Sequence, residues 1–471
     1  MTKTLSLLWF RQDLRLSDNP AVAKAADLGS VLAIYILDDC APNLFKIGSA
    51  SKIWLYYSLE KLNRSLGGSL NIYNGAADKI ISELTASYPI HHIFYNQCYE
   101  PWHLKQESLV KSLCKKRSID CQSFNGNYLW DPDQILKNDG SYYRVFHAYK
   151  NKSHQSLPRL SIEKTMKIDP IKDLKNALSI ADLPLLPRGK RWYEKIVCAW
   201  QIGEVAAHNK LSNFIKTSLA GYKHGRDYPC KNQTSLLSPH LHFGEISPSQ
   251  IWKAIHDVDV YDEDRAHFSS ELIWREFSCY LLYHVKSLHK ENFNAKFNRF
   301  PWQDHEKYFH AWKTGQTGYP IVDAGIRQLW QTGYMHNRVR MIVASFLVKN
   351  LMIHWHKGRD WFWDCLVDAD LANNSASWQW VAGCGVDAAP YFRIFNPMTQ
   401  GKKFDKYGTY TRQFVPELAN LPDKYLFAPW TTPKSILNSA KIILGKSYPN
   451  PIVDLNTSRN RALRAYKKLT K

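Results

Sequence analysis

The chain has 471 residues, more than one hydrophobic core usually organises, so we expect two domains and a connector. Hydrophobic residues make up 45% of it and charged residues 22%, as in folded globular proteins, which excludes a disordered or collagen-like chain. No apolar run approaches the roughly 18 residues of a membrane span, and the nine cysteines are scattered without a CxxC pair. We therefore expect a cytoplasmic protein without membrane contact and without a structural zinc ion.

The formal net charge is +20, and it is unevenly distributed. Residues 1–130 carry 14 basic and 11 acidic side chains, a net charge of +3, so the later residues carry +17. A domain with such an excess attracts polyanions, and nucleic acid is the commonest partner. A basic surface that serves only solubility is the alternative.

Residues 1–130 alternate short apolar runs with segments of helical pattern. Four runs are predicted strands: Leu5–Phe10, Val31–Leu37, Leu70–Tyr73 and His92–Tyr95. Ser17, Asp18 and Asn19 stand before Pro20, and together they offer side-chain caps and a proline suited to the first turn of a helix. Strands that alternate with helices predict an α/β domain with a doubly wound parallel sheet.

The rest of the chain changes character twice. Residues 131–200 include Pro158, Pro170, Pro184 and Pro187, many lysines and weak periodicity, which predicts a long connector. From residue 201 to 471 the strand pattern is absent, and stretches such as Glu271–Leu288 and Ile321–Leu351 show helical spacing. We expect an all-α second domain over 201–471, and 11 of the 17 tryptophans lie beyond residue 250.

Two short patterns suggest ligands only weakly. Gly383-x-Gly385-x-x-Ala388 matches a relaxed dinucleotide-binding pattern but follows no predicted strand, so we set it aside. His354-Trp355-His356 has no further ligand at a metal-binding spacing, and we expect no metal.

Four segments combine residues that a binding site would use. Three hydroxyls precede Pro239 in Thr234–Ser238, and such a helix entrance suits phosphate oxygens. Glu271–Phe277 places a carboxylate, an indole and a guanidinium on one helical face. Met335–Met341 pairs an amide with arginines, and Asp368–Trp380 sets polar residues between two aspartates and two tryptophans. Core packing and solvated helix faces are the alternatives for each segment taken alone.

Together these segments resemble the photolyase and cryptochrome family, and the resemblance runs essentially from end to end. The segments that carry it are Leu8–Leu16, Arg226–Pro229, Glu271–Phe277, Thr317–Ala324, His336–Met341 and Asp387–Pro397. Within the family the chain is most similar to bacterial cyclobutane-dimer photolyases of the first class. His336-Asn337 stands where 6-4 photolyases and animal cryptochromes carry a histidine pair, and Asn374 where plant cryptochromes carry aspartate.

The resemblance implies light-dependent DNA repair, in which excited reduced FAD splits cyclobutane pyrimidine dimers, a carbon–carbon lyase reaction. The implied partner is UV-damaged DNA, bound by a monomer in the bacterial cytosol. A cryptochrome-like blue-light photoreceptor without repair is the alternative. The residues implied for FAD binding are Tyr222, Thr234, Ser235, Leu236, Leu237, Ser238, Arg275, Asn337, Asp368, Asp370 and Asn374.

The same resemblance assigns three further sets of residues. Those implied to surround the dimer as catalytic residues are Glu271, Trp274, Asn337, Met341 and Trp380. Those implied to contact DNA are Arg226, Glu271, Trp274, Arg275, Asn337, Arg338 and Gln400. Those implied to carry electrons to an oxidised flavin are Trp302, Trp355 and Trp378, since an indole can hold a transient radical.

The resemblance also implies an antenna chromophore in the first domain. Folate-binding members carry an Asn-Glu pair where this chain has Trp102-His103, although Lys290 is kept at another folate-side position. Methenyltetrahydrofolate, deazaflavin and no antenna all stay open.

Overall fold

The computed structural model describes residues 4–38, 41–156, 168–172, 174–187, 189, 191–388 and 392–470. The chain forms two compact units. The first comprises Met1–Ala220, Ser235–Lys286 and Val367–Ala372, and the second comprises Gly221–Thr234, Ser287–Leu366 and Asn373–Lys471. The domain boundaries expected at residues 130 and 200 stay predictions. Within the described residues, no helix combines the length and the apolar character that crossing a bilayer requires.

A parallel sheet organises the start of the first unit, with strand order β3-β2-β1-β4-β5. The strands are β1 (Thr4–Phe10), β2 (Gly29–Leu37), β3 (Asn71–Asn74), β4 (Ile90–Asn96) and β5 (Asp120–Phe124), and a short β6 (Asp169–Pro170) pairs with β2. The predicted α/β fold with a doubly wound sheet is confirmed. Strand β5 was not predicted, because its residues are exposed or only partly buried and their sequence shows no apolar run.

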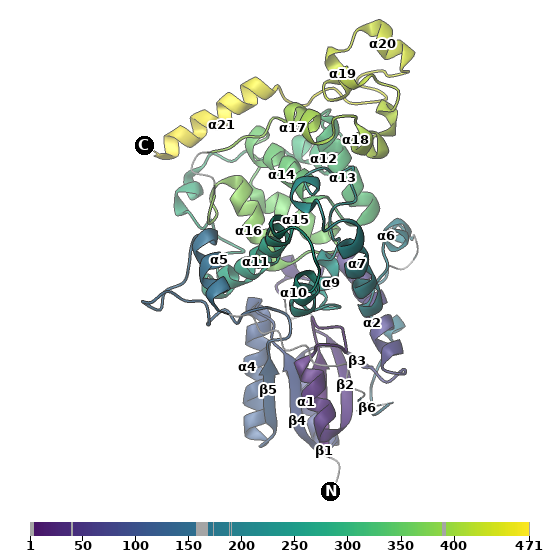
Figure 1. The fold of residues 1–471 in the computed structure, drawn as a ribbon, viewed down its shortest axis with the longest axis vertical. Helices are drawn as coiled ribbons and strands as arrows, with labels where there is room; N and C mark the ends of the chain where they lie inside the picture. The colour runs from purple at the N-terminus through teal and green to yellow at the C-terminus, as the bar shows by residue number, and fades with distance from the viewer. Residues whose placement is uncertain are drawn as a thin grey trace. The chain divides into compact units, whose positions relative to one another are not determined.

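Helices cover both faces of this sheet (Figure 1). They are α1 (Pro20–Leu28), α2 (Ser49–Ser65), α3 (Ala77–Ser87) and α4 (Pro101–Lys116). Side chains of a strand alternate between faces, so Leu8 and Phe10 pack with α1 and α2. Leu7 and Trp9 pack with α3 and α4 on the other face. Helix α1 begins as predicted, because Asn19 accepts a hydrogen bond from the Val22 amide at 3.2 Å and Pro20 follows.

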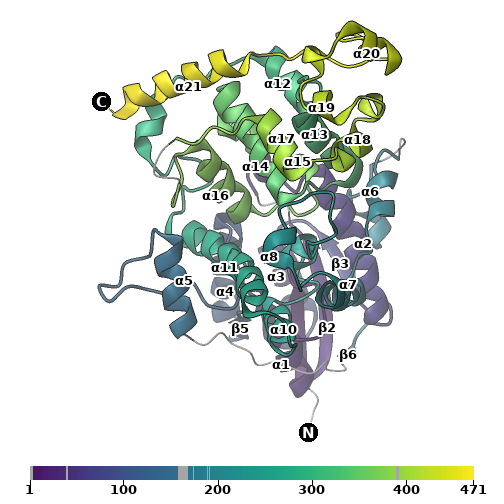
Figure 2. The same cartoon turned by 45° about the horizontal axis from the view of Figure 1, so that its top comes forward.

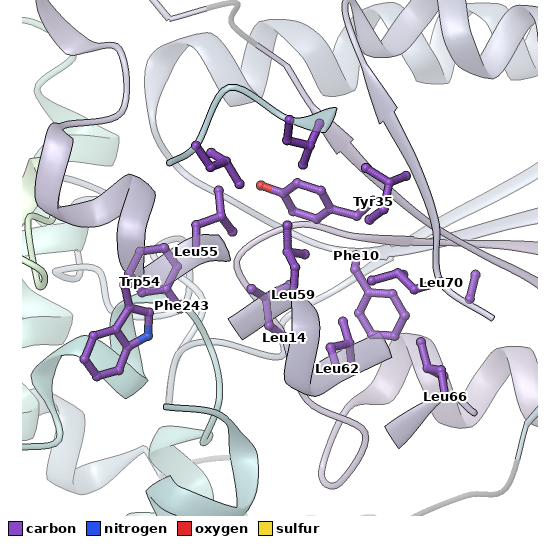
Figure 3. Packing of buried hydrophobic residues seen from close by; sticks show 14 of the residues in the cluster. Phe10, Leu14, Tyr35, Trp54, Leu55, Leu59, Leu62, Leu66, Leu70 and Phe243 are labelled. Carbon is purple, nitrogen blue, oxygen red and sulfur yellow. The ribbon is translucent and has the colours of Figure 1, made fainter. Parts of the chain in front are cut away.

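The larger core explains why residues 235–286 belong to the first unit (Figure 3). The indole of Trp54, in α2, stacks on Phe243 with ring centroids 6.2 Å apart and donates to Glu245 Oε1 at 3.1 Å. Large aromatic side chains dominate such cores because each buries 150–250 Å². The remaining helices of this unit are α5 (Phe146–Gln155), α6 (Glu194–Ala199), α7 (Glu204–Thr217), α9 (Ser238–His242), α10 (Pro248–His256) and α11 (Asp262–His284).

The second unit is built from helices and turns, as expected for the all-α region (Figure 2). Its helices are α8 (Tyr222–Gly225), α12 (Glu306–Lys313), α13 (Pro320–Thr332), α14 (Asn337–Ser345), α15 (Trp355–Cys365), most of α16 (Leu371–Ala382), α17 (Pro397–Phe404), α18 (Thr409–Phe414), α19 (Asp423–Leu426), α20 (Lys434–Ser439) and α21 (Leu455–Thr470). The helical spacing over Ile321–Leu351 does not mark one helix. Gly333 ends α13 in the left-handed conformation, as a C-cap glycine does, and a π-helical turn at Phe346–Asn350 follows α14.

Candidate functional site

One polar cluster lies in the first unit, where α9 meets the residues that lead into α16. Ser238 Oγ donates to Asp368 Oδ2 at 2.6 Å. Asp370 Oδ2 lies 3.8 Å from His242 Nδ1. Asp368 is buried and Asp370 half-buried. The structure therefore brings together three residues expected near the flavin, and it adds His242, which sequence reasoning missed.

Arg275 on α11 closes the same cluster. Its guanidinium donates to the carbonyls of Asn127 at 2.9 Å and Leu241 at 3.4 Å, and it lies 4.6 Å from the ring centroid of Tyr128. The next residue, Glu276, is buried, and burial raises its pKa to about 7 although Arg275 beside it opposes that shift. A guanidinium held by two carbonyls and an aromatic face is fixed in position, which suits a phosphate or another anionic group.

The loop that precedes α9 has an unusual backbone. Leu236 adopts a φ of +54°, a left-handed conformation that non-glycine residues rarely take. Such a conformation costs on the order of 1–3 kcal/mol and persists where the surroundings enforce it, often at binding sites. Ser235 Oγ accepts from the Leu237 amide at 3.4 Å. Among these expected FAD contacts, Ser235–Ser238 lie in the first unit and Thr234 in the second.

A basic and aromatic cluster lies in the second unit. Arg338 on α14 donates to Asp227 Oδ2 at 2.7 Å and lies 4.6 Å from the Phe404 ring centroid. Arg226 lies 5.4 Å from the ring centroid of Tyr222. The structure therefore gathers two of the expected DNA contacts and one expected FAD contact around the segment that includes α8.

The start of α14 carries further predicted residues. His336 caps this helix, because its Nδ1 accepts from the Arg338 amide at 3.2 Å. Burial, with Arg226 nearby, lowers the pKa of His336 to about 4, so this ring is neutral at neutral pH. Asn337 is exposed and Met341, one turn later, is half-buried. The cap thus fixes the helix end that presents Asn337.

Helix α17 adds positive charge beside this cluster. Gln400, an expected DNA contact, is half-buried on α17, and Phe404 at the end of that helix packs against Arg338. Lys402, Lys403 and Lys406 are exposed. Sequence reasoning did not single them out, although the run Lys402-Lys403 followed by Lys406 was a readable sign of a phosphate-binding surface.

The three tryptophans expected to carry electrons lie in the second unit. Trp378 and Trp355 are buried, whereas Trp302 is half-buried. Trp378 packs so closely on α15 that a Cβ added at Gly358 would meet its ring at 2.1 Å, and Gly358 lies one turn after Trp355. The ring of His354 contacts both of the other two indoles, with its centroid 5.8 Å from that of Trp355 and 4.9 Å from that of Trp302. Of the three, Trp302 is the one that is partly exposed.

The residues expected to surround the dimer come from both units. Glu271 and Trp274 lie half-buried on α11 in the first, whereas Asn337, Met341 and Trp380 belong to the second. One face of Trp274 is already covered by Phe146, with ring centroids 3.5 Å apart and planes 5° from parallel. Phe146 was missed because it lies in the predicted connector. A common pocket for the five residues stays a prediction.

A possible metal site among the described residues lies elsewhere. Cys98, Glu100 and His103 offer ligand atoms within 4.8 Å of one another. However, Glu100 already accepts from Gln12 at 2.9 Å and pairs with His103 at 3.0 Å. These contacts account for the carboxylate without an ion, and the expectation of no metal stays a prediction.

Comparison with known proteins identifies the family. One family model, described as DNA photolyase, matches residues 6–167, and another, the FAD binding domain of DNA photolyase, matches residues 268–468. The chain is 44% identical over 467 residues to the deoxyribodipyrimidine photo-lyase of Agrobacterium fabrum, across 98% of this chain and 97% of that one. The chain belongs to the photolyase and cryptochrome family.

Membership of the photolyase and cryptochrome family confirms the resemblance seen in the sequence and the expected FAD-binding region. A crystal structure described as a bacterial class III photolyase from Agrobacterium tumefaciens superposes with a TM-score of 0.95 and 42% identity, across 100% of this chain and 98% of that one. The first-class assignment of this chain therefore stays a prediction. Cryptochrome-2 of Arabidopsis thaliana is 35% identical across 98% of this chain and 78% of its own length. The relatives of this chain thus include both photolyases and cryptochromes.

Proposed function

We propose that the chain is a deoxyribodipyrimidine photo-lyase, which splits cyclobutane pyrimidine dimers in UV-damaged DNA by light-driven electron transfer from reduced FAD. The observation that carries this proposal over a photoreceptor is Asn374. Its Nδ2 donates to the Arg359 carbonyl at 3.0 Å, which leaves its Oδ1 as an acceptor. The family resemblance implies that Asn374 lies near the flavin N5, where a neutral acceptor would favour the protonated, reduced ring that repair requires.

The residues of the first unit fit FAD by their chemistry. Arg275 supplies a fixed positive charge for a phosphate. Ser235 and Ser238, close in sequence to the strained residue Leu236, supply hydroxyl groups. Asp368 and Asp370, which contact Ser238 and His242, supply carboxylates that could accept hydrogen bonds from N–H groups of a flavin ring. Tyr222, Asn337 and Asn374, in the second unit, are the other residues that the family resemblance implies for FAD. When bound and reduced, FAD supplies the electron on excitation by light.

Basic side chains of the second unit would hold the DNA. Arg226, Arg338 and Gln400 lie in or beside one cluster, and Lys402, Lys403 and Lys406 add exposed charge from the α17 region. Phosphate contacts of this kind bind DNA without reading its sequence. A crosslinked dimer is easier to flip out of the duplex than normal bases, a principle for which photolyases are themselves a standard example.

Glu271, Trp274, Asn337, Met341 and Trp380 would enclose the flipped dimer. Because Phe146 covers one face of Trp274, only the other face can stack on a pyrimidine. The Glu271 carboxyl, one turn before Trp274 on α11, would donate a hydrogen bond to a pyrimidine carbonyl as negative charge develops there.

Repair of a defined substrate tests this proposal. Anaerobic, reduced protein is mixed with an oligonucleotide that contains one thymine dimer, and intact thymines are counted after illumination and after an equal time in the dark. We expect restoration in the light only, and its loss in Trp274→Ala. Flavin photochemistry without thymine restoration would favour the cryptochrome-like photoreceptor, the alternative that the 35% identity to Cryptochrome-2 supports. Monomeric state, bacterial cytosolic location and the identity of an antenna stay predictions.

A further inference from the structure

The last helix of the second unit, α21, is strongly basic. Its sequence over Leu455–Thr470 contains Arg459, Arg461, Arg464, Lys467 and Lys468 and no acidic residue. The helix leads to the C-terminus of the chain (Figures 1 and 2). The DNA contacts proposed above in this unit lie near α8 and on α14 and α17, so they leave the charges of α21 without a function.

One face of α21 fixes the helix to the unit. Asn350 donates to Ser458 Oγ at 2.9 Å, and Arg461 donates to the Asn350 carbonyl at 2.7 Å. The ring of Tyr466 stacks on Phe392, with centroids 4.7 Å apart and planes 10° from parallel. The buried side chains of this face are Ser458, Ala462, Ala465 and Leu469. The orientation of α21 within its unit is therefore set by packing, and its other face is directed to solvent.

The solvent face carries the remaining basic residues. Arg459, Arg464 and Lys468 are exposed, and Arg464 lies one helical turn before Lys468. The other exposed residues of this face include Asn456, Thr457 and Asn460, which are polar and uncharged.

A neighbouring 3-10 helix, η3 (Ala295–Arg299), extends this face. The ring of Phe297 in η3 lies 6.2 Å from that of Tyr466, and Lys296 and Arg299 on either side of it are exposed. We call Lys296, Arg299, Arg459, Arg464 and Lys468 the α21 surface. Within the residues that the structure describes, none of these five side chains forms an ion pair.

The stability of the helix does not account for this arrangement. The helix dipole favours cations in the last turn, which accounts for Lys468, but the effect falls off before it reaches Arg459 or Arg464. Like charges one turn apart, such as Arg464 and Lys468, weaken a helix when no acidic side chain lies between them. Charges that oppose the stability of the element that bears them are typical of a surface for an anionic partner.

The spacing and chemistry of the α21 surface fit the phosphates of nucleic acid. Arg459 and Lys468 are nine positions apart, which is about 14 Å along a helix axis and matches about four phosphates of one DNA strand. Asn456 and Asn460 can add hydrogen bonds to phosphate oxygens. A membrane surface fits less well, because a helix that lies on lipid buries its apolar face there, and the apolar face of α21 is already packed on the protein.

We propose that the α21 surface binds the phosphates of duplex DNA outside the segment that contains the dimer, an inference that rests on the proposed repair function. Such a contact is independent of damage and of base sequence, because it depends on charge alone. It would raise the affinity for long duplexes and hold the protein on DNA that contains no dimer.

Salt titrations of DNA binding test the proposal, with FAD-loaded protein kept in the dark so that the dimer stays intact. The variant is Arg464→Gln/Lys468→Gln. For a duplex of about 40 base pairs with one central thymine dimer, we expect the slope of log affinity against log salt to fall by about 2, since each lost phosphate contact removes about 0.9. For a duplex of about 10 base pairs, about 34 Å long and centred on the dimer, we expect the native slope.

Two further variants make the comparison specific. Lys115→Gln/Lys116→Gln, at exposed lysines of α4 in the first unit, removes the same net charge and should keep the native slope with both duplexes. Lys296→Gln/Arg299→Gln removes the other half of the α21 surface and should lower the slope for the long duplex only. Because all six side chains are exposed, we expect each variant to fold, which circular dichroism checks.

An unchanged slope for the long duplex in both α21-surface variants would overturn the proposal, and so would an equal decrease with both duplexes, which would place the surface at the dimer itself. A labelled polyglutamate peptide that binds native protein but not Arg464→Gln/Lys468→Gln, with DNA binding unchanged, would assign the surface to an acidic protein instead. Failure of the proposed repair function gives a different result, since illuminated native protein would then restore no thymine whatever the salt slopes are.

Discussion

The contact between Gly358 and Trp378 allows one prediction to be worked out in detail. In Gly358→Ala, the new methyl group would meet three atoms of the Trp378 six-membered ring at 2.1, 2.5 and 2.6 Å. All three distances are shorter than real carbon contacts, and Trp378 is 2% exposed, so the ring has little room to move. The substitution therefore overpacks the interface between α15 and α16.

Two opposing effects set the size of the change in stability. Overpacking of a core typically costs 1–3 kcal/mol, whereas alanine is favoured over glycine inside a helix by about 1 kcal/mol. Because the indole is rigid and buried, the steric cost should lie in the upper part of that range, about 2–3 kcal/mol, so after the helical gain we expect Gly358→Ala to lower the free energy of unfolding by about 1–2 kcal/mol. The displaced ring should also slow photoreduction of the flavin.

Urea unfolding and steady illumination of the oxidised protein measure these two effects. Gly358→Ala in a Trp378→Phe background is the matched control, since phenylalanine lacks the far ring atoms and the clash should largely disappear. The coupling energy between the two substitutions, taken from the free energies of unfolding in a double-mutant cycle, would then account for most of the steric cost. A Gly358→Ala protein that is as stable as the native protein and photoreduces equally fast would refute the packing argument.

Other predictions concern the tryptophans expected to carry electrons, the dimer pocket, the DNA surface and pH. Trp378→Phe should block photoreduction but leave repair by pre-reduced protein nearly intact, and equal photoreduction would contradict its role. Glu271→Ala should lower the repair yield per photon. In a salt titration, Lys402→Ala should reduce the slope of log affinity against log salt by about 1, whereas Lys115→Ala on α4 should leave it unchanged. Burial lowers the pKa values of His336 and His354 to about 4 in the folded protein. As the pH falls below 6.5, the unfolded chain therefore takes up protons before the folded protein does, and the free energy of unfolding should decrease until the pH reaches about 4. A free energy of unfolding that stays constant over this range would contradict the prediction.

The strands that face the core on both sides were readable from the sequence. Leu5–Phe10 and Val31–Leu37 are nearly continuous apolar runs because parallel strands are buried on both faces. The edge strand β5 could not be predicted from the sequence, because the side chains of Asp120–Phe124 are exposed or only partly buried and need no apolar run. The cap at Asn19 was predictable because it depends only on residues adjacent in the chain.

Features that depend on distant segments were beyond the sequence patterns. Residues 235–286 continue the helical pattern, yet Phe243 joins the core around Trp54 in the first unit. Phe146 covers Trp274 from a stretch whose prolines and lysines suggested only a connector. The left-handed Leu236 has no residue-type signal, because glycine or asparagine would normally mark that conformation. The contact between His354 and Trp302 became visible only once their rings were placed in the fold.

The most direct test of the account is repair by pre-reduced Trp378→Phe protein, which isolates electron transfer to the dimer from photoreduction of the flavin. Thymine absorbance is followed under blue light, without oxygen, in the presence of dimer-containing DNA. The account predicts that absorbance recovers at nearly the native rate per photon and stays constant in the dark. Reduced protein that binds the damaged DNA and absorbs light but restores no thymine would contradict it.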